Sequence, residues 1–261
     1  MTTTSTHLRA RDLIVAFDGR PALEVESLDI ASGEAVAIVG PSGAGKTTLL
    51  RAFAALVRPT GGHVEIGGAR IDGLSAAELR RTRATIGFVH QHFGLVPNLR
   101  VVQNVLTGRL GRQSLAGAMR AMVMPAAADV DRAHAILERV GIADKLYQRT
   151  DQLSGGQRQR VALARALFQQ PTALLADEPV SSVDPARARD TVALLAEISR
   201  EQGLTLCASL HNLELAREFF PRLIGLKRGR IAFDRPSAEI DTGEFDSLYE
   251  LEHSANGNRS G

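Results

Sequence analysis

One stretch of nine residues constrains the fold of this chain more than any other. It follows an apolar run at residues 35–39 that is typical of a buried strand. The residues of the stretch are Gly40, Pro41, Ser42, Gly43, Ala44, Gly45, Lys46, Thr47 and Thr48. The glycines allow a tight loop with inward-pointing N–H groups, and a helix is expected to begin at about Lys46. A triphosphate can bind at such a helix N-terminus, whereas the alternative is a glycine-rich turn with an incidental lysine.

Composition excludes several classes of protein. Hydrophobic residues make up 44% and charged residues 23% of the 261 residues, as in ordinary globular proteins. The formal charge of +2 gives no reason to expect a nucleic-acid partner over the whole surface, and leaves only a local basic patch open. Cys207 is the only cysteine, which excludes an internal disulfide, and its apolar neighbours predict a buried side chain. No secretory signal and no run of about 18 apolar residues is recognisable, so any membrane role is expected to come through a partner.

Strand and helix patterns alternate along the chain. The predicted strands are residues 13–17, 22–30, 35–39, 63–66, 86–90, 173–176 and 204–208. The predicted helices start at about residue 46 and cover residues 101–110, about 114–124, 130–140, 155–167 and 186–201. This alternation predicts a mainly parallel sheet with a helical insertion between residues 99 and 147. From residue 241 onward little apolar periodicity is present, and a partly disordered end is expected.

An acidic pair ends one of the predicted strands. Residues 174–176 are apolar and lead to Asp177 and Glu178, at the sheet edge where ligands of open α/β folds bind. In P-loop NTPases such an aspartate holds Mg²⁺ together with the loop hydroxyl, here Thr47. The adjacent Glu178 can orient or deprotonate an attacking water. Alone, the pair is more typical of a solvated strand edge, but the glycine-rich loop favours a catalytic interpretation.

A second candidate phosphate site lies at residues 153–157, Leu-Ser-Gly-Gly-Gln, where small residues begin a helix. Its members are Ser154, Gly155, Gly156 and Gln157. The chain carries in order the glycine-rich P-loop at residues 40–48, Gln91, this LSGGQ segment, the acidic pair, residues 181–184 and His211. In this ordered set the chain resembles the ATP-binding subunits of ABC transporters, and the resemblance covers about residues 8–234.

The resemblance implies a fold and its divisions. An α/β P-loop NTPase core with a mainly parallel sheet would carry an antiparallel β subdomain and a helical subdomain insertion. The expected cassette spans residues 7–240. Residues 7–91 and 158–240 would form the RecA-like core with the β subdomain, and residues 92–157 the helical subdomain with LSGGQ. Residues 241–261 would form a C-terminal extension.

The resemblance also implies that two chains enclose two ATP molecules. Ser154 and Gly156 of one chain would face the P-loop of the other. Within the P-loop, Lys46 would hold the β- and γ-phosphates, Thr47 the Mg²⁺ and Thr48 the α-phosphate.

The remaining motif residues would complete the site. Asp177 would hold Mg²⁺, Glu178 would act as the catalytic base, Gln91 would reach Mg²⁺ and the water, His211 would contact the γ-phosphate, Phe17 would stack on adenine and Asp184 would link the two sites. Taken singly, Phe17 is more typical of a core aromatic. Gln91 and His211, taken singly, are satisfied polar residues at strand ends.

Residues 103–112, Gln-Asn-Val-Leu-Thr-Gly-Arg-Leu-Gly-Arg, indicate a subclass. This segment is similar to the NVL-x-GRLG pattern of phosphonate importer ATPases. The resemblance implies import of a phosphonate or a related phosphorus oxyanion such as phosphite. The implied partners are a second copy, integral-membrane permease subunits and, indirectly, a solute-binding protein, at the cytoplasmic face of a bacterial inner membrane. An importer ATPase for another solute and a soluble ABC ATPase of a carbon–phosphorus lyase complex stay as alternatives.

The permease contact is expected at about residues 91–109. Phe93, Leu95, Val96 and Leu99 form an apolar cluster beside Gly94. By family resemblance this region receives a short cytoplasmic helix of the permease, and the alternative is an ordinary subdomain core.

Overall fold

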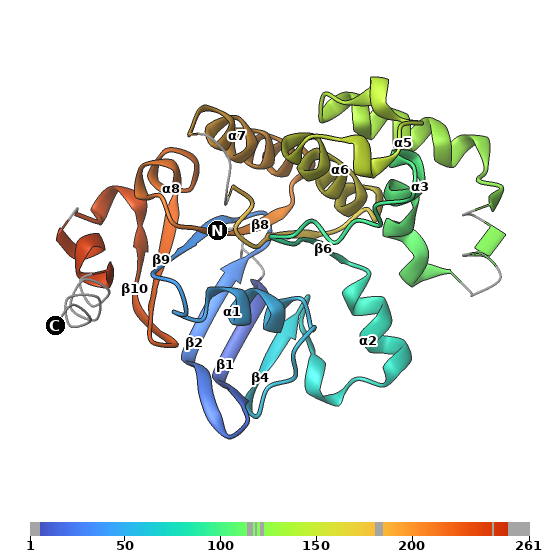
Figure 1. Cartoon of the computed structure of the whole chain (residues 1–261). Helices are drawn as coiled ribbons and strands as arrows, with labels where there is room; N and C mark the ends of the chain where they lie inside the picture. Colours follow the sequence, from blue (N-terminus) through green and yellow to red (C-terminus); the bar gives the residue numbers. More distant parts are fainter. Residues whose placement is uncertain are drawn as a thin grey trace, which may run out of the picture.

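A six-stranded sheet runs through the middle of the protein in the computed structural model (Figure 1). The structure describes residues 6–113, 117, 119–120, 123–180, 185–241 and 243–249. The strand order is β10-β9-β3-β8-β7-β6, and every neighbouring pair is parallel except β9 and β10. The strands are β3 (Ala35–Val39), β6 (Ile86–Val89), β7 (Ala173–Ala176), β8 (Thr205–Leu210), β9 (Arg222–Lys227) and β10 (Arg230–Pro236). The predicted mainly parallel sheet is confirmed.

A second, antiparallel sheet has the order β2-β1-β4-β5. Its strands are β1 (Thr6–Phe17), β2 (Arg20–Ala31), β4 (Gly61–Ile66) and β5 (Ala69–Arg70). β1 begins well before the predicted strand at residues 13–17. Its first half places Arg9 and Arg11 on the outer face, where both pair with Asp29 at 2.8 and 2.5 Å. Apolar Leu8 and Ala10 alternate with these arginines, which is a strand pattern that the prediction missed.

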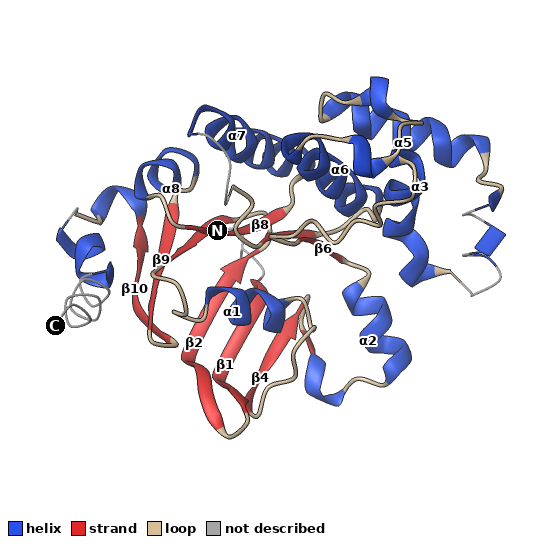
Figure 2. Ribbon diagram, viewed as in Figure 1, coloured by secondary structure: helices blue, strands red, loops and turns tan. Residues whose placement is uncertain are grey.

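Helices lie on both sides of the six-stranded sheet. α6 and α7 cover one face, and α1 with the antiparallel sheet covers the other (Figures 1 and 2). The helices are α1 (Lys46–Phe53), α2 (Ala76–Arg83), α3 (Val101–Leu106), α5 (Ala127–Arg139), α6 (Gly155–Phe168), α7 (Pro185–Gln202) and α8 (Leu213–Phe219). Short 3₁₀ segments are η1 (Ile71–Gly73), η2 (Thr107–Arg112), η3 (Ala143–Lys145), η4 (Thr150–Gln152) and η5 (Ser237–Glu239). The sheet is therefore a middle layer.

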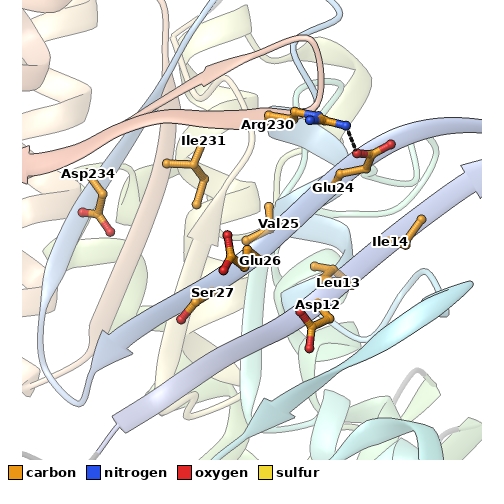
Figure 3. Close-up of a pocket in the computed structure, with 10 residues that line it drawn as sticks. All are labelled: Asp12, Leu13, Ile14, Glu24, Val25, Glu26, Ser27, Arg230, Ile231 and Asp234. Carbon is orange, nitrogen blue, oxygen red and sulfur yellow. Dashed lines mark hydrogen bonds and ion pairs between the residues drawn. The ribbon is translucent and has the colours of Figure 1, made fainter.

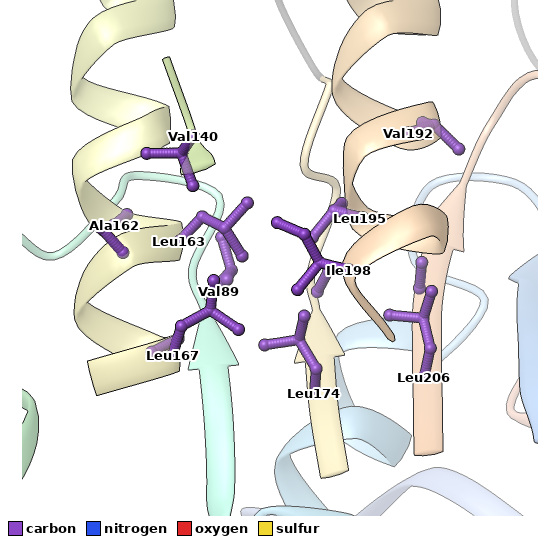
Figure 4. Close-up of a cluster of buried hydrophobic side chains, with 14 of the residues drawn as sticks. Val89, Val140, Ala162, Leu163, Leu167, Leu174, Val192, Leu195, Ile198 and Leu206 are labelled. Carbon is purple, nitrogen blue, oxygen red and sulfur yellow. The ribbon is translucent and has the colours of Figure 1, made fainter. Parts of the chain in front are cut away.

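Two apolar cores fill the space on either side of this sheet. Successive side chains of a strand point to opposite faces, so Leu174 joins the core under α6 and α7 while Leu175 joins the core under α1. Figure 4 shows Leu174 and Leu206 facing Leu195 and Ile198 of α7. Continuous apolar strands thus bury both faces, as parallel sheets require. The predicted burial of Cys207 is confirmed, and burial raises the pKa of its thiol.

Three segments differ from the sequence prediction or lie outside the described residues. The helix predicted at residues 101–110 ends at Leu106 and continues as the 3₁₀ segment η2. Within η2 a Cβ on Gly108 would lie 2.2 Å from the carbonyl oxygen of Arg165, so backbone packs on backbone there. The helix predicted at about residues 114–124 lies largely outside the described residues. Residues 243–249 are helical, and Phe245 and Leu248 are buried against the main core, so apolar contacts order a segment that showed little periodicity.

Candidate active site

Four adjacent parallel strands end at one edge of the main sheet. β3 leads to the P-loop at residues 40–48, β7 to Asp177, β8 to His211 and β6 to Gln91. The strand ends are in register, since Val39 lies opposite Leu210, and Ala176 opposite Val89. The carboxyl edge of a parallel sheet is where open α/β folds bind ligands.

The P-loop surrounds a hollow of about 420 Å³ at the start of α1. Three of its glycines have positive φ, and a Cβ on Gly40 would lie 2.2 Å from the carbonyl oxygen of Leu226. Only glycine fits there, because β9 passes directly beneath the loop. The Lys46 side chain is buried, and its Nζ donates to the carbonyl oxygens of Gly40 at 2.7 Å and Pro41 at 3.0 Å. The helix N-terminus, the backbone N–H groups and this ammonium make the hollow suited to phosphate.

A hydroxyl and a carboxylate meet beside the P-loop. Thr47 Oγ1 donates to Asp177 Oδ1 at 2.9 Å, and Asp177 is almost completely buried. Hard oxygen ligands of this kind suit Mg²⁺, which keeps several waters and phosphate oxygens in its shell. No cluster of three or more His, Cys, Asp or Glu side chains able to hold a metal occurs in the described part of the chain. The pair thus fits a Mg²⁺ ion that is held jointly with a nucleotide.

Glu178 lies at the centre of a polar network. Its Oε2 accepts from Gln91 Nε2 at 2.9 Å, and its Oε1 lies 2.6 Å from His211 Nε2 and 4.0 Å from Lys46 Nζ. Its backbone has φ of +47°, which is uncommon for a residue with a side chain. Gln91 and His211, which the sequence predicts at the ends of separate strands, therefore both contact the Glu178 carboxylate.

The LSGGQ segment begins α6 and stays apart from the P-loop hollow. Ser154 caps the helix: its Oγ accepts from the Gln157 N–H at 3.3 Å, and the Gln157 side chain accepts from the Ser154 N–H at 2.9 Å. Ser154 and Gly155 are exposed, and Gly156 and Gln157 are half-buried. No residue of the segment is among those that line the P-loop hollow. A single chain does not bring its two predicted phosphate sites together.

Two other predicted site residues stand apart from this network. Phe17 ends β1 with half of its surface exposed, opposite Arg20. It does not line the P-loop hollow, although Pro21 and Ala22, just beyond the turn, do. Asp184 lies outside the described residues. Adenine stacking by Phe17 and a link through Asp184 stay predictions.

The turn between β9 and β10 also borders the hollow, which the sequence prediction missed. Gly229 N–H donates to the Ala44 carbonyl at 2.9 Å, and its own carbonyl accepts from the Glu24 N–H at 2.7 Å. Arg228 lines the hollow with an exposed side chain and a φ of +51°. No hydrogen bond or ion pair joins its side chain to another residue that the structure describes. The only sequence signal is a glycine in an ordinary hairpin turn.

We expect Arg228→Ala to weaken ATP and ADP binding equally, by about fivefold. Arg228 lies at the Pro21 and Ala22 end of the hollow, so its guanidinium is suited to the part of the nucleotide that both ligands share. The estimate corresponds to about 1 kcal/mol for an exposed charged contact. Titration calorimetry with both nucleotides measures it, and Arg228→Lys should keep most of the affinity. Unchanged affinity in Arg228→Ala would exclude the contact.

A larger hollow lies elsewhere, between the outer face of β1 and β2 and strand β10 (Figure 3). Its volume is about 670 Å³. Four carboxylates line it, from Asp12, Glu24, Glu26 and Asp234, and Arg230 pairs with Glu24. A surplus of negative charge repels phosphate. This hollow is therefore not the nucleotide site, although it is the larger one.

The fold and the site together define an ATP-binding cassette. Residues 23–181 match the ABC transporter family, and the chain belongs to that family. Over 247 residues it is 51% identical to the phosphonates import ATP-binding protein PhnC 2 of Pseudomonas aeruginosa, covering 94% of this chain and 91% of the relative.

Solved cassettes share the fold. The dimeric structure of MJ0796, a bacterial ABC transporter cassette, has a TM-score of 0.77 and 32% identity, covering 88% of this chain and 98% of that one. The cassette MJ1267 has a TM-score of 0.82 and 26% identity, covering 94% and 99%. The predicted family and fold class are confirmed.

Proposed function

We propose that this chain is the ATP-hydrolysing subunit of an importer that moves a phosphonate or a related phosphorus oxyanion through a membrane permease. The observation that carries the proposal is the 51% identity, over nearly the whole of both chains, to a phosphonates import ATP-binding protein. The similarity of residues 103–112 to the phosphonate importer pattern supports it. The carboxylate network at the P-loop supplies the chemistry.

Each residue of the network has a role in this proposal. Lys46 and the loop N–H groups bind the β- and γ-phosphates, and Thr48 the α-phosphate. Thr47 and Asp177 hold Mg²⁺, which neutralises phosphate charge when bound.

Glu178, at the centre of the network, activates the attacking water in this proposal. Glu178 accepts a proton from the attacking water, while Gln91 and His211 orient the water and the γ-phosphate. Gln91 and His211 both contact the Glu178 carboxylate, so the three side chains share one position beside the P-loop.

The site is completed in trans in this proposal. Ser154 and Gly156 of a second copy face the P-loop, because the same segment of one chain lies outside the hollow. Dimeric MJ0796 supports such a pairing. A homodimer on the cytoplasmic face of the bacterial inner membrane would then drive the permease. No helix in the described residues is long and apolar enough to cross a membrane.

The permease contact is proposed at a basic groove beside residues 91–109. The groove has a volume of about 440 Å³ and lies between α2, β6, η2 and α6. Arg80, Arg83, Arg165 and His90 line it, and no carboxylate does. Burial, with Arg165 and Arg51 nearby, lowers the pKa of His90, so the charge of the groove comes from the arginines. We therefore expect the permease segment to carry acidic residues.

The apolar cluster next to the groove divides between two roles. Phe93 and Leu95 are half-buried and pack against the main core, whereas Val96 is 48% exposed. Arg165 donates to the carbonyl oxygen of Phe93 at 2.7 Å and also bonds that of Gly94. This arginine links the end of β6 to α6, so a partner in the groove contacts a segment joined directly to Gln91.

We expect Arg80→Glu to abolish co-purification with the permease while the isolated chain keeps its ATPase activity within about twofold. Arg80 is exposed on α2 and lines the groove, so the change alters charge without touching the P-loop. Pull-down from membranes that contain the permease measures the contact, and charge reversal at an interface typically costs several kcal/mol. Arg81→Glu is the matched control, since Arg81 neighbours Arg80 but does not line the groove. Equal losses in both variants would place the contact elsewhere.

Growth on a phosphonate as the sole phosphorus source tests the transport function. A strain lacking its own importer should grow when it carries this chain with its permease and binding protein, and should fail with Lys46→Ala. Growth on phosphite but not on phosphonate would identify phosphite as the substrate, which is still a phosphorus oxyanion. Purification with soluble lyase subunits in place of a permease would favour the carbon–phosphorus lyase alternative.

A further inference from the structure

Ser209 connects the two carboxylate residues of the site from a neighbouring strand. It lies on β8, two residues before His211, and its side chain is completely buried. Its hydroxyl donates to Asp177 Oδ1 at 3.1 Å and accepts from the Glu178 N–H at 2.7 Å. One hydroxyl therefore donates to Asp177 and accepts from Glu178, two consecutive residues at the end of β7.

The first of these bonds fixes the Asp177 carboxylate. Thr47 Oγ1 and Ser209 Oγ both donate to Oδ1, from the P-loop on one side and β8 on the other. Two donors on one oxygen of a buried carboxylate restrict its rotation about χ2. Outer partners of this kind orient groups that hold a metal.

The second bond holds the backbone of Glu178. This residue has φ of +47°, a conformation that costs energy for a residue with a Cβ and persists only where the surroundings impose it. Its N–H lies in the part-buried floor of the site, where an unpaired donor is costly. The bond to Ser209 satisfies this donor in the conformation that directs the side chain toward Gln91 and His211.

We propose that Ser209 is a positioning residue for the hydrolytic site, which orients Asp177 toward the metal and Glu178 toward the water. The inference rests on the proposed roles of these two carboxylates in ATP hydrolysis. Ser209 acts through these two residues, which use both its hydroxyl hydrogen and an acceptor position. The sequence alone does not single out Ser209, because any buried serine can lie in an apolar strand.

Cys207 provides a matched control for the test. It lies two residues earlier on β8, is also completely buried and points to the same face of the sheet. Cys207→Ala and Ser209→Ala each remove one heavy atom from this strand. A role of Ser209 in strand packing alone predicts similar effects for the two variants. Ser209→Thr keeps the hydroxyl and tests for rescue.

We expect Ser209→Ala to lower kcat by about 10- to 100-fold, with KM for ATP within twofold, and to raise the Mg²⁺ concentration for half-maximal activity. Mn²⁺ binding to the ADP complex, followed by electron paramagnetic resonance, should weaken by a similar factor. Cys207→Ala should leave all three quantities within twofold. Ser209→Thr should restore Mn²⁺ binding to within about threefold of the wild type.

Two results would overturn the inference. One is Mn²⁺ affinity in Ser209→Ala within twofold of the wild type, and the other is an equal loss in Cys207→Ala. The proposed function fails separately, if wild-type chain does not hydrolyse ATP or if Glu178→Gln hydrolyses it at the wild-type rate. The Mn²⁺ measurement decides the role of Ser209 in either case, because it requires no turnover.

Discussion

Glu178→Gln is expected to bind ATP with near wild-type affinity and to hydrolyse it about 10²–10⁴-fold more slowly. Glutamine has the same shape and can still contact Gln91 and His211, but it cannot accept a proton from water. The change removes the 4.0 Å ion pair between Glu178 and Lys46, but Lys46 keeps its bonds to the carbonyl oxygens of Gly40 and Pro41. The loss therefore falls on kcat, as for a group that acts only in the transition state.

Steady-state phosphate release measures this loss, and titration calorimetry measures ATP affinity. Glu218→Gln is the control, because Glu218 is a carboxylate that pairs with Arg189 outside the P-loop hollow. Lys46→Ala should show the opposite pattern, with weak nucleotide binding. Turnover by Glu178→Gln within about threefold of the wild type would remove Glu178 as the base.

The strand ends of this site could be predicted because their physics is local. An apolar run followed by a polar residue places that residue at the carboxyl edge of a parallel sheet. Asp177, Gln91 and His211 all follow such runs, and the register of β6, β7 and β8 brings them together. Gln91 and His211 have no distinguishing sequence context of their own, so only the order of the motifs along the chain identified them as site residues.

Other features of the fold and of the site could not be predicted, because they depend on contacts between segments that are distant in the sequence. Ser209 bonds Asp177 and Glu178 at the end of β7, and Arg228 borders a hollow formed by other segments. Neither a serine in an apolar strand nor an arginine in a hairpin turn signals this. The end of α3 depends on the approach of Gly108 to the carbonyl of Arg165, 57 residues away by sequence number (165 − 108). The helix at residues 243–249 forms where Phe245 and Leu248 find a core built by earlier segments. The pattern of apolar residues within a short stretch of sequence carries no information about these contacts.

The sequence indicates two phosphate sites, and the family resemblance implies that they meet between two chains; within one chain of the structure the two sites lie apart. α6 begins at Gly155 with an exposed cap residue, Ser154, whereas the P-loop hollow is lined without it. Two helix N-termini that cannot meet on one nucleotide within a chain can do so between two chains. ATP should therefore close a homodimer, and ADP, which lacks the γ-phosphate, should not.

Ser154→Arg is expected to abolish this ATP-dependent dimer. The side chain caps α6 through its hydroxyl, so the change removes a cap worth about 1 kcal/mol and puts a bulky group where a second chain's γ-phosphate would lie. Sedimentation of Glu178→Gln with saturating ATP and Mg²⁺ should show a dimer, and the double variant with Ser154→Arg a monomer that still binds ATP. Gln152→Arg, at an exposed position two residues before Ser154, adds the same single charge and is the control. A monomer in Glu178→Gln alone would contradict the shared site, and a dimer in the double variant would show that the chains associate through another surface.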